Sequence, residues 1–288
     1  MALSAFFQRL SILLDMIKFQ HTIFALPFAI MSAFLAAKGC PAAWQAGWVL
    51  GAMVGARSCA MTFNRIADLD YDARNPRTQS WALPTKRISL PAAWVFCIAS
   101  AALFFLSAGM LNMLCLSLAP VALAVLLGYS YTKRFTRFSH LVLGLSLGIA
   151  PVGAWLGVTG AFALPPVLLC AAVTCWVAGF DIIYACQDVD FDRQAGLYSL
   201  PVTRGVHPAL RIAQGLHVLM IVALLCLAAV AHVGMLYMAG VAGVALLLFY
   251  EHRLLRPFDP SKISIAFFTL NGIASLLFMA LTLADILL

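Results

Sequence analysis

The sequence predicts an all-α protein, a multi-span transmembrane bundle of about nine helices that forms a single domain over residues 1–288. Of the 288 residues, 64% are hydrophobic and 10% are charged, whereas soluble domains have about 45–50% and about 25%. The apolar residues fall into nine runs, each close to the roughly 20 residues that a helix needs to cross a bilayer core. The basic residues gather in every second loop, as they do in multi-span membrane proteins.

The expected helices follow one another along the whole chain, separated by short polar or Pro/Gly segments. The first apolar run leads into this multi-span pattern and has no signal-peptide cleavage site. The segments between the runs are too short for a soluble domain, so we expect one bundle. The expected helices cover approximately residues 16–37, 42–67, 89–108, 112–132, 140–160, 163–187, 208–231, 233–252 and 263–286.

The positions of lysine and arginine predict how the bundle is oriented in the membrane. The N-terminal segment and the loops after the second, fourth, sixth and eighth expected helices are basic, and the opposite loops contain only Lys38. By the positive-inside rule, the N-terminus is cytoplasmic and the C-terminus lies outside. We therefore expect a multi-pass protein of the bacterial cytoplasmic (inner) membrane. The basic residues on the cytoplasmic side are Arg9, Lys18, Arg74, Arg77, Lys86, Arg87, Lys133, Arg134, Arg137, Arg193, Arg204, Arg211, Arg253, Arg256 and Lys262.

Several classes of function are disfavoured by the residues that are present. The net charge of +7 is spread over these loops rather than gathered in one patch, so no nucleic-acid partner is expected. Eight cysteines include no C-x-x-C pair, which argues against a zinc site or a thioredoxin-type motif. The histidines show no ligand spacing, and we interpret them as loop or interface residues. They are His21, His140, His207, His217, His232 and His252.

Acidic residues are concentrated in two short motifs at the cytoplasmic ends of the second and sixth expected helices. The first lies in "NRIADLDYDARNPR" and the second in "DIIYACQDVDFDRQ". Asn64, Asp68 and Asp72 are spaced at i, i+4 and i+8, which places them on one face of a helix. Together the motifs contain six of the eleven acidic residues, namely Asp68, Asp70, Asp72, Asp188, Asp190 and Asp192.

Such clusters need a reason, because like charges at i and i+4 destabilise a helix. One interpretation is a solvated helix end with Arg65, Arg74 and Arg193 as partners. The recurrence of the same D-x-D-x-D pattern favours a shared function instead. Carboxylates bind Mg²⁺, Mn²⁺ or Ca²⁺, and Mg²⁺ fills its remaining positions with water and substrate phosphates. Two carboxylate clusters on one side of the membrane therefore favour a site for a metal-bound diphosphate.

Two other phosphate or metal motifs do not fit. The first motif begins like an EF-hand loop, but its sixth and twelfth positions are Ala73 and Gln79, where an EF-hand has Gly and Glu. No Walker A sequence occurs in the chain, which argues against nucleotide hydrolysis.

The two motifs resemble the signatures of the UbiA-type membrane prenyltransferases. The family pattern N-x-x-x-D-x-x-x-D is matched by Asn64, Asp68 and Asp72, and its D-x-x-x-D pattern is matched by Asp188 and Asp192. An arginine seven residues before the motif asparagine is matched by Arg57, and a Y-x-x-x-K-R pattern is matched at Tyr129, Lys133 and Arg134. Of the first-helix pattern Arg/Lys-x-x-Lys-Pro, only Lys18 matches, since His21 and Thr22 replace Lys-Pro.

The resemblance covers essentially the whole chain and is closest to the 4-hydroxybenzoate polyprenyltransferase branch, which includes enzymes of the futalosine route to menaquinone. It implies transfer of a polyprenyl group from a polyprenyl diphosphate to a hydroxylated aromatic carboxylate. The acceptor is 4-hydroxybenzoate or 1,4-dihydroxy-6-naphthoate, in ubiquinone or menaquinone biosynthesis. Membrane lipid and the cofactor Mg²⁺ are the other expected partners.

The resemblance also implies roles for individual residues. Mg²⁺ would be held by Asp68, Asp72, Asp188 and Asp192, with Asn64 as a neutral ligand or hydrogen-bond partner. The diphosphate would be bound by cations from the loops and the first helix, namely Lys18, Arg77, Lys133 and Arg134.

Three further side chains are expected near the reacting groups. Tyr129 is the leading candidate to shield the allylic cation, with Tyr131 and Tyr184 also near. Arg57 lies inside a helix, where a charge usually has a function; it either binds the acceptor carboxylate or pairs with Asp181. Asp181 in turn either orients the acceptor hydroxyl or pairs with Arg57.

Other functions remain as alternatives. Arg57 and Asp181 would line an ion path in a transporter or channel. A prenyltransferase of another acceptor class would make haem O, chlorophyll or an archaeal-type lipid, and a scaffold protein would have no activity. The sequence leaves open the isoprenoid length, the oligomeric state, and the roles of Asp70 and Asp190.

Overall fold

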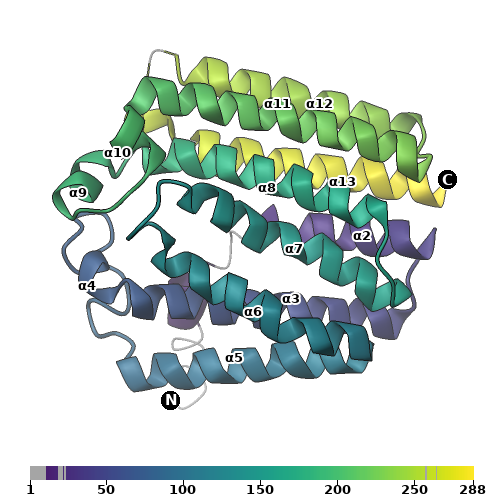
Figure 1. The fold of residues 1–288 in the computed structure, drawn as a ribbon, viewed down its shortest axis with the longest axis horizontal. Helices are drawn as coiled ribbons and strands as arrows, with labels where there is room; N and C mark the ends of the chain where they lie inside the picture. Colours follow the sequence, from purple (N-terminus) through teal and green to yellow (C-terminus); the bar gives the residue numbers. More distant parts are fainter. Residues whose placement is uncertain (1–10, 19–21, 23, 257, 264) are drawn as a thin grey trace.

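The computed structural model of the chain describes residues 11–18, 22, 24–256, 258–263 and 265–288. These residues form a bundle of long helices without strands (Figure 1). Nine of the helices described have between 12 and 26 residues, which confirms the predicted fold class. They are α2 (Leu26–Ala37), α3 (Ala43–Ala67), α5 (Leu90–Leu111), α6 (Met113–Thr132), α7 (Ser139–Thr159), α8 (Leu164–Ala185), α11 (Val206–Ala231), α12 (Met235–Leu254) and α13 (Asn271–Leu287).

Seven helical segments of the described chain are long and apolar enough to cross a membrane, the last of them covering Pro260–Leu287. The chain is therefore a multi-pass membrane protein. The two remaining long helices differ from these seven. With 12 residues, α2 is about 18 Å long at about 1.5 Å per residue, too short for a core of about 30 Å. With 25 residues, α3 is long enough but less apolar.

The first expected helix is wrong in its N-terminal part. Residues 11–16 are helical, but the helix ends before Lys18, whose φ of 48° is left-handed. Helix α2 begins only at Leu26 and has Pro27 in its first turn, where a fixed φ and a missing N–H are tolerated. His21, the other basic position of the expected first-helix motif, lies outside the described residues.

The last expected helix is also interrupted. A π-helix over Ile265–Leu270 precedes α13. The side-chain amide of Asn271 donates to the carbonyl of Ala266 at 2.9 Å and to Glu251 at 3.3 Å, and it accepts from the Trp176 indole at 2.6 Å. These polar contacts tie the irregular turn to α8 and α12. A wide turn of this kind inside an apolar run has no signal in hydrophobic periodicity.

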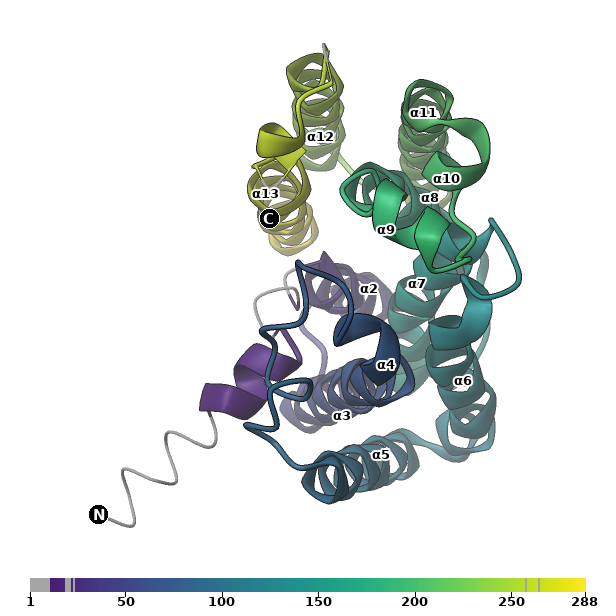
Figure 2. The same cartoon turned by 90° about the vertical axis from the view of Figure 1, so that its left-hand side faces the viewer.

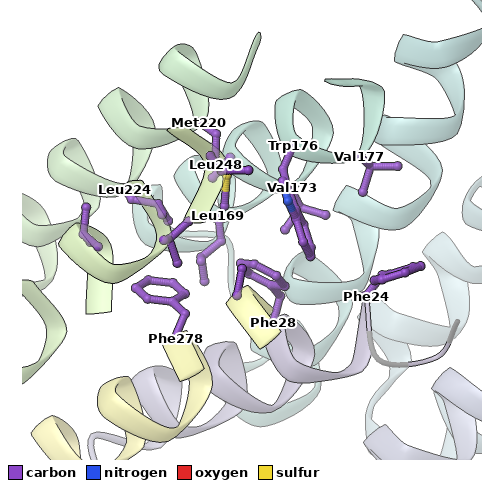
Figure 3. Close-up of a cluster of buried hydrophobic side chains, with 14 of the residues drawn as sticks. Phe24, Phe28, Leu169, Val173, Trp176, Val177, Met220, Leu224, Leu248 and Phe278 are labelled. Carbon is purple, nitrogen blue, oxygen red and sulfur yellow. The ribbon is translucent and has the colours of Figure 1, made fainter. Parts of the chain in front are cut away.

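The bundle has two main apolar cores of different character. The core among α2, α8, α11, α12 and α13 is filled by large side chains such as Phe28, Trp176 and Phe278 (Figure 3). The core among α2, α3, α5, α6 and α7 is built largely from alanines, with Val49 and Leu111 among its few larger members. Small side chains leave room between helices, so a cavity is expected in the second core.

Three short helices lie at one end of the bundle, and two of them, α4 and α9, carry aspartates of the two motifs (Figure 2). Helix α4 (Leu69–Asp72) follows α3 after the single residue Asp68, and α9 (Val189–Gln194) follows α8 after a turn that ends at Asp188. Helix α10 (Leu200–Arg204) then leads into α11. The two motifs, 120 residues apart in the chain, thus come from equivalent places at the ends of two long helices.

Candidate active site

Each aspartate motif begins at a bend between a long helix and a short one. Asp68 ends α3 with φ −97° and ψ 9°, and Asp188 precedes α9 with φ −104° and ψ 10°. The expectation of one continuous helical face through Asp72 is therefore only partly right, because the helix bends at Asp68. In both motifs the backbone N–H of the third aspartate donates a helical hydrogen bond to the carbonyl of the first, at 2.8 Å for Asp72 and 2.7 Å for Asp192.

The first motif is surrounded by cations and amides. The Asp68 carboxylate accepts hydrogen bonds from Arg134 at 3.1 Å and from Asn64 at 3.1 Å, and the Lys133 ammonium lies 3.8 Å away. Arg65 donates to Asp72 at 3.1 Å and to the Asn64 side-chain oxygen at 2.9 Å. Asp68 and Asp72 therefore both have charged partners within the protein.

In the second motif Asp188 is well compensated, whereas Asp192 has no ion pair among the described residues. Arg77 donates two hydrogen bonds, of 3.0 and 2.7 Å, to the Asp188 carboxylate and a third, of 2.8 Å, to the Tyr184 hydroxyl. Asn75 donates to the same carboxylate at 3.3 Å. Asp192 is only 8% exposed, and no ion pair to it occurs among the described residues.

Burial shifts the pKa of the third aspartate of each motif, Asp72 or Asp192, which we call the inner aspartate. It raises the pKa of Asp72, against the opposing charge of Arg65, and it raises the pKa of Asp192 to about 6, against the opposing charge of Lys133. Lys133 lowers the pKa of both groups, so its ammonium lies where it acts on both motifs. Both carboxylates would be stabilised in their charged form by an additional cation between them.

The expected site residues converge on one polar cavity of about 320 Å³. Arg134 is the exception: its guanidinium contacts Asp68 and the Ala67 carbonyl without lining the cavity. Arg134 also stacks over Tyr131, with 4.7 Å to the ring centroid. The expected residues that line the cavity are Lys18, Arg57, Asn64, Asp68, Asp72, Arg77, Tyr129, Lys133, Asp181, Asp188 and Asp192.

Arg57 and Asp181 do not pair with each other. Arg57 donates to the Lys18 carbonyl at 3.2 Å, and its Nε has no partner among the described residues. The Asp181 carboxylate lies 2.7 Å from Nδ1 of His140, whose Nε2 faces the backbone N–H of Leu200 at 3.3 Å. Because that N–H can only donate, Nε2 is the acceptor and Nδ1–H donates to Asp181. The ion-pair alternative for Arg57 is therefore wrong, and its guanidinium keeps free donors at the cavity.

Sequence reasoning missed several residues of the cavity wall. The Trp81 ring lies beneath three cations, with centroid distances of 4.2 Å to Arg65, 5.6 Å to Lys18 and 5.7 Å to Arg77. His140, interpreted from sequence as a loop or interface residue, is buried and orients Asp181. Neither residue stands in a periodic or charged motif, so only the folded loops reveal them.

A second cavity of about 330 Å³ adjoins the polar one and is almost wholly apolar. It lies in the core of small side chains, among α3, α5, α6 and α7. Arg57, Met61 and Tyr129 line both cavities, as do two leucines of α7. A ligand with a charged head and a long apolar tail would fit across this boundary.

The donor set suits a hard divalent cation that also takes ligands from a substrate. Within the described part of the chain, no group of three or more Asp, Glu, His or Cys side chains is close enough to hold an ion alone. Each motif instead offers a pair of carboxylates. Mg²⁺ uses one or two carboxylates and completes its shell with water and phosphate oxygens, so the arrangement fits such an ion together with a diphosphate.

Comparison with known proteins places the chain and its fold in one family. The model of the UbiA prenyltransferase family matches residues 25–273. A 4-hydroxybenzoate octaprenyltransferase of Xanthomonas euvesicatoria is 32% identical over 253 residues, covering 87% of this chain and 83% of the relative. A UbiA homolog from Aeropyrum pernix is 34% identical with a TM-score of 0.85, covering 93% of this chain and 98% of its own. A UbiA homolog from Archaeoglobus fulgidus bound to GPP and Mg²⁺ shares the fold, with a TM-score of 0.74 at 24% identity and coverage of 96% and 99%.

Proposed function

The chain belongs to the UbiA prenyltransferase family and is a prenyltransferase, and on that premise we propose the substrates and the roles of its residues. The enzyme transfers a polyprenyl group from a polyprenyl diphosphate to a hydroxylated aromatic carboxylate in quinone biosynthesis. The observation that carries the proposal is the convergence of both aspartate motifs, Arg77, Lys133 and Arg57 on one polar cavity beside an apolar one. The relatives named 4-hydroxybenzoate octaprenyltransferase support an aromatic acceptor.

The diphosphate binds at the aspartate motifs together with Mg²⁺. Bound there, Mg²⁺ supplies Lewis-acid stabilisation of the charge that develops on the leaving diphosphate. The A. fulgidus homologs that bind DMAPP or GPP with Mg²⁺ support this role. In this chain the ligands would be Asp68, Asp72, Asp188 and Asp192, with Asn64 as a neutral oxygen donor. Asn64 now accepts from Arg65, so that oxygen would have to be shared.

Cations of the protein bind the remaining diphosphate oxygens. Arg77 has a planar fork of donors that suits bidentate contact, and Lys133 acts as a point charge. Both already lie against motif carboxylates, at 2.7 Å from Asp188 and 3.8 Å from Asp68. Lys18 lines the same cavity from the N-terminal segment. Arg134 has a supporting role, since it holds Asp68 without lining the cavity.

The acceptor binds deeper in the cavity, at the boundary with the apolar space. The unpaired donors of Arg57 hold its carboxylate, and Asp181, oriented by His140, accepts a hydrogen bond from its hydroxyl. That hydrogen bond raises the electron density at the ring carbon next to the hydroxyl. This carbon attacks C1 of the prenyl group as the C1–O bond breaks, and it then loses its proton to a base such as the released diphosphate.

Aromatic and apolar side chains protect the reacting prenyl group from water. Tyr129 lines both cavities, and Tyr184 lies against Phe267 with 4.3 Å between the ring centroids. Aromatic faces stabilise a nearby cation by their quadrupole. The apolar cavity among α3, α5, α6 and α7 holds the isoprenoid units that follow the reacting one.

We place this end of the bundle on the cytoplasmic side of a bacterial inner membrane. The proposal is supported by the basic loops around the motifs and by the bacterial origin of the relatives. The measurement is labelling of a single introduced cysteine at exposed Arg193 by a membrane-impermeant maleimide. Labelling in inverted vesicles but not in intact cells is expected, and the reverse pattern would contradict the orientation.

The reaction is tested by product formation in membranes that contain the protein. The membranes are incubated with geranyl diphosphate and Mg²⁺, with either 4-hydroxybenzoate or 1,4-dihydroxy-6-naphthoate, and the prenylated ring is detected by mass spectrometry. We expect product with 4-hydroxybenzoate, lost in Asp68→Ala and Asp188→Ala but retained in the exposed Asp190→Ala. Product with only the naphthoate would move the enzyme to the menaquinone route. No product with either acceptor, from folded protein, would contradict the aromatic assignment.

A further inference from the structure

We propose that the protein has a second anion site, which binds the phosphate headgroup of an anionic phospholipid between the start of α11 and the end of α12. A cavity of about 270 Å³ lies there, lined by His207, Arg211, Gln214, His252, Arg256 and Phe258 with two leucines. None of these residues lines the cavity of the aspartate motifs. Both helices run along one edge of the bundle (Figure 1), and the cavity lies at the end that carries the motifs.

The charge of this cavity is suited to an anion. Arg211 and Arg256 line it, and no Asp or Glu does. Arg256 donates to Gln214 at 3.1 Å, which leaves most of its donors available, and Arg211 has no ion pair within the described part of the chain. The cavity also lies at the first turns of α11, where the helix dipole favours negative charge.

One wall of the cavity is held rigid by buried hydrogen bonds. Nδ1 of His217 lies 2.9 Å from Nε2 of His252, and Nε2 of His217 lies 3.3 Å from the Trp176 carbonyl. A carbonyl can only accept, so His217 Nε2 carries a proton and its Nδ1 accepts from His252. This chain of contacts holds the His252 ring against His217 of α11, which in turn is bound to the backbone of α8. The wall is therefore preorganised rather than a loose surface of long side chains.

Exposed apolar side chains continue the cavity along both helices, which favours a lipid over free phosphate. On α11 the face that begins with His207, Arg211 and Gln214 continues through residues at helical spacing. These are Val218, Val222 and Leu225, which are 58%, 49% and 42% exposed. On α12, Phe249 lies three residues before His252 and is 64% exposed. An acyl chain would lie on these residues while its phosphate occupies the basic cavity.

The packing of the two helices explains why the space is open. Helix α11 packs mainly on α8, and α12 packs mainly on α13, so the two contact each other only lightly (Figure 2). Basic pockets between membrane helices on the cytoplasmic side are suited to anionic headgroups. The volume is close to the lower limit of about 300 Å³ for small-molecule sites, which fits a headgroup rather than a whole lipid.

The test is a lipid titration of the purified full chain in detergent, followed by native mass spectrometry. The probes are phosphatidylglycerol, phosphatidylcholine with the same acyl chains, and glycerol 3-phosphate. The variants are Arg211→Gln and Arg256→Gln, with Arg253→Gln as the matched control, since Arg253 is exposed on the same helix end and does not line the cavity. Thermal unfolding without lipid checks that each variant is folded.

We expect phosphatidylglycerol to bind more tightly than phosphatidylcholine. Each cavity variant should lose about fivefold in affinity for it, the effect of one basic residue at an anionic lipid, and Arg253→Gln should keep wild-type affinity. An equal loss of phosphatidylglycerol affinity in Arg253→Gln would show that general surface charge binds the lipid, and it would overturn the proposed site. If glycerol 3-phosphate bound as tightly as phosphatidylglycerol, the ligand would not be a lipid. If phosphatidylglycerol bound no more tightly than phosphatidylcholine, both the anion site and its lipid ligand would be overturned.

Discussion

In the first aspartate motif the chain bends at Asp68, with φ −97° and ψ 9°, and in the second it bends at Asp188, with φ −104° and ψ 10°. A short helix follows each bend. The inner aspartates, Asp72 and Asp192, are 9% and 8% exposed, while the middle aspartates point to solvent. The two motifs are therefore close structural copies, set at the ends of α3 and α8.

The motifs differ in how their charge is compensated. Asp68 and Asp72 both have arginine partners, at 3.1 Å in each case. In the second motif Arg77 holds Asp188 at 2.7 Å, but no ion pair to Asp192 occurs in the part of the chain that the structure describes. Burial then raises the pKa of Asp192 to about 6. In the first motif, protein cations compensate the charge of both Asp68 and Asp72. In the second motif, the Asp192 carboxylate would be compensated by a cation bound with the ligand.

The largest effect is expected on turnover, where the two motifs should behave alike. Asp68→Asn and Asp192→Asn should each lower kcat for prenyl transfer by about 10²–10³-fold, as loss of one group that stabilises developing charge does. The measurement is initial rate with geranyl diphosphate and saturating acceptor at matched protein levels. A normal rate in Asp192→Asn would show that the second motif does not act as a copy of the first.

A smaller effect is expected from the arginine that connects the motifs. Arg77→Lys should lower kcat/KM for the diphosphate by about 10–100-fold, because a lysine cannot hold Asp188 through two parallel hydrogen bonds. Arg74→Lys is the matched control, since Arg74 is an exposed arginine of the same loop that donates to the Asp70 carbonyl. If both variants lost the same activity, the loop charge rather than the fork of Arg77 would be responsible.

The two motifs should differ in how their substitutions change the stability of the protein, although they should not differ in their effect on turnover. Asp68→Asn should cost about 1–2 kcal/mol, since Arg134 loses a charge-assisted hydrogen bond. Asp192→Asn should leave stability unchanged or raise it, because it removes a buried charge without an ion pair. The thermal unfolding midpoints in metal-free detergent report both. A lower midpoint for Asp192→Asn would mean that this carboxylate already has a stabilising partner.

The smallest effect is expected at the middle aspartates, whose role the sequence leaves open. The Asp190 side chain is 92% exposed and lies 3.9 Å from Arg193, and Asp70 is also exposed. Exposed residues outside a site usually change little. Asp70→Asn and Asp190→Asn should each keep the turnover within about twofold of wild type. A tenfold loss at either position in the same assay would place it among the ligand contacts.

The length of the hydrophobic runs predicted most of the long helices. It did not predict where polar contacts or backbone geometry interrupt a run. The left-handed Lys18 and the start of α2 at Leu26 break an apolar stretch that the sequence continues. The π-helix before Asn271 is held by that side chain and its contacts to Glu251 and Trp176. Such contacts join residues far apart in the chain, so they leave no periodic signal.

Most charged residues that line the polar cavity were predictable from the sequence, but the pairings between them were not. Spacing and resemblance identified the carboxylates and most cations that line the cavity. Which cation lies on which carboxylate depends on loops that meet only in the folded chain, as for Arg77 and Asp188 across 111 residues. For the same reason the sequence allows a pair between Asp181 and Arg57, whereas the partner of Asp181 in the structure is His140.

A double-mutant cycle tests most directly whether both motifs hold one Mg²⁺–diphosphate group. The measurement is the affinity for geranyl diphosphate, with Mg²⁺ and with EDTA, in wild type, Asp68→Asn, Asp192→Asn and the double variant. Each single variant should lose about 10–100-fold of the Mg²⁺-dependent affinity. The double variant should lose little more than either single one, because residues that act on one group are not additive. Losses that multiply in the double variant would show two independent sites and contradict a single shared group.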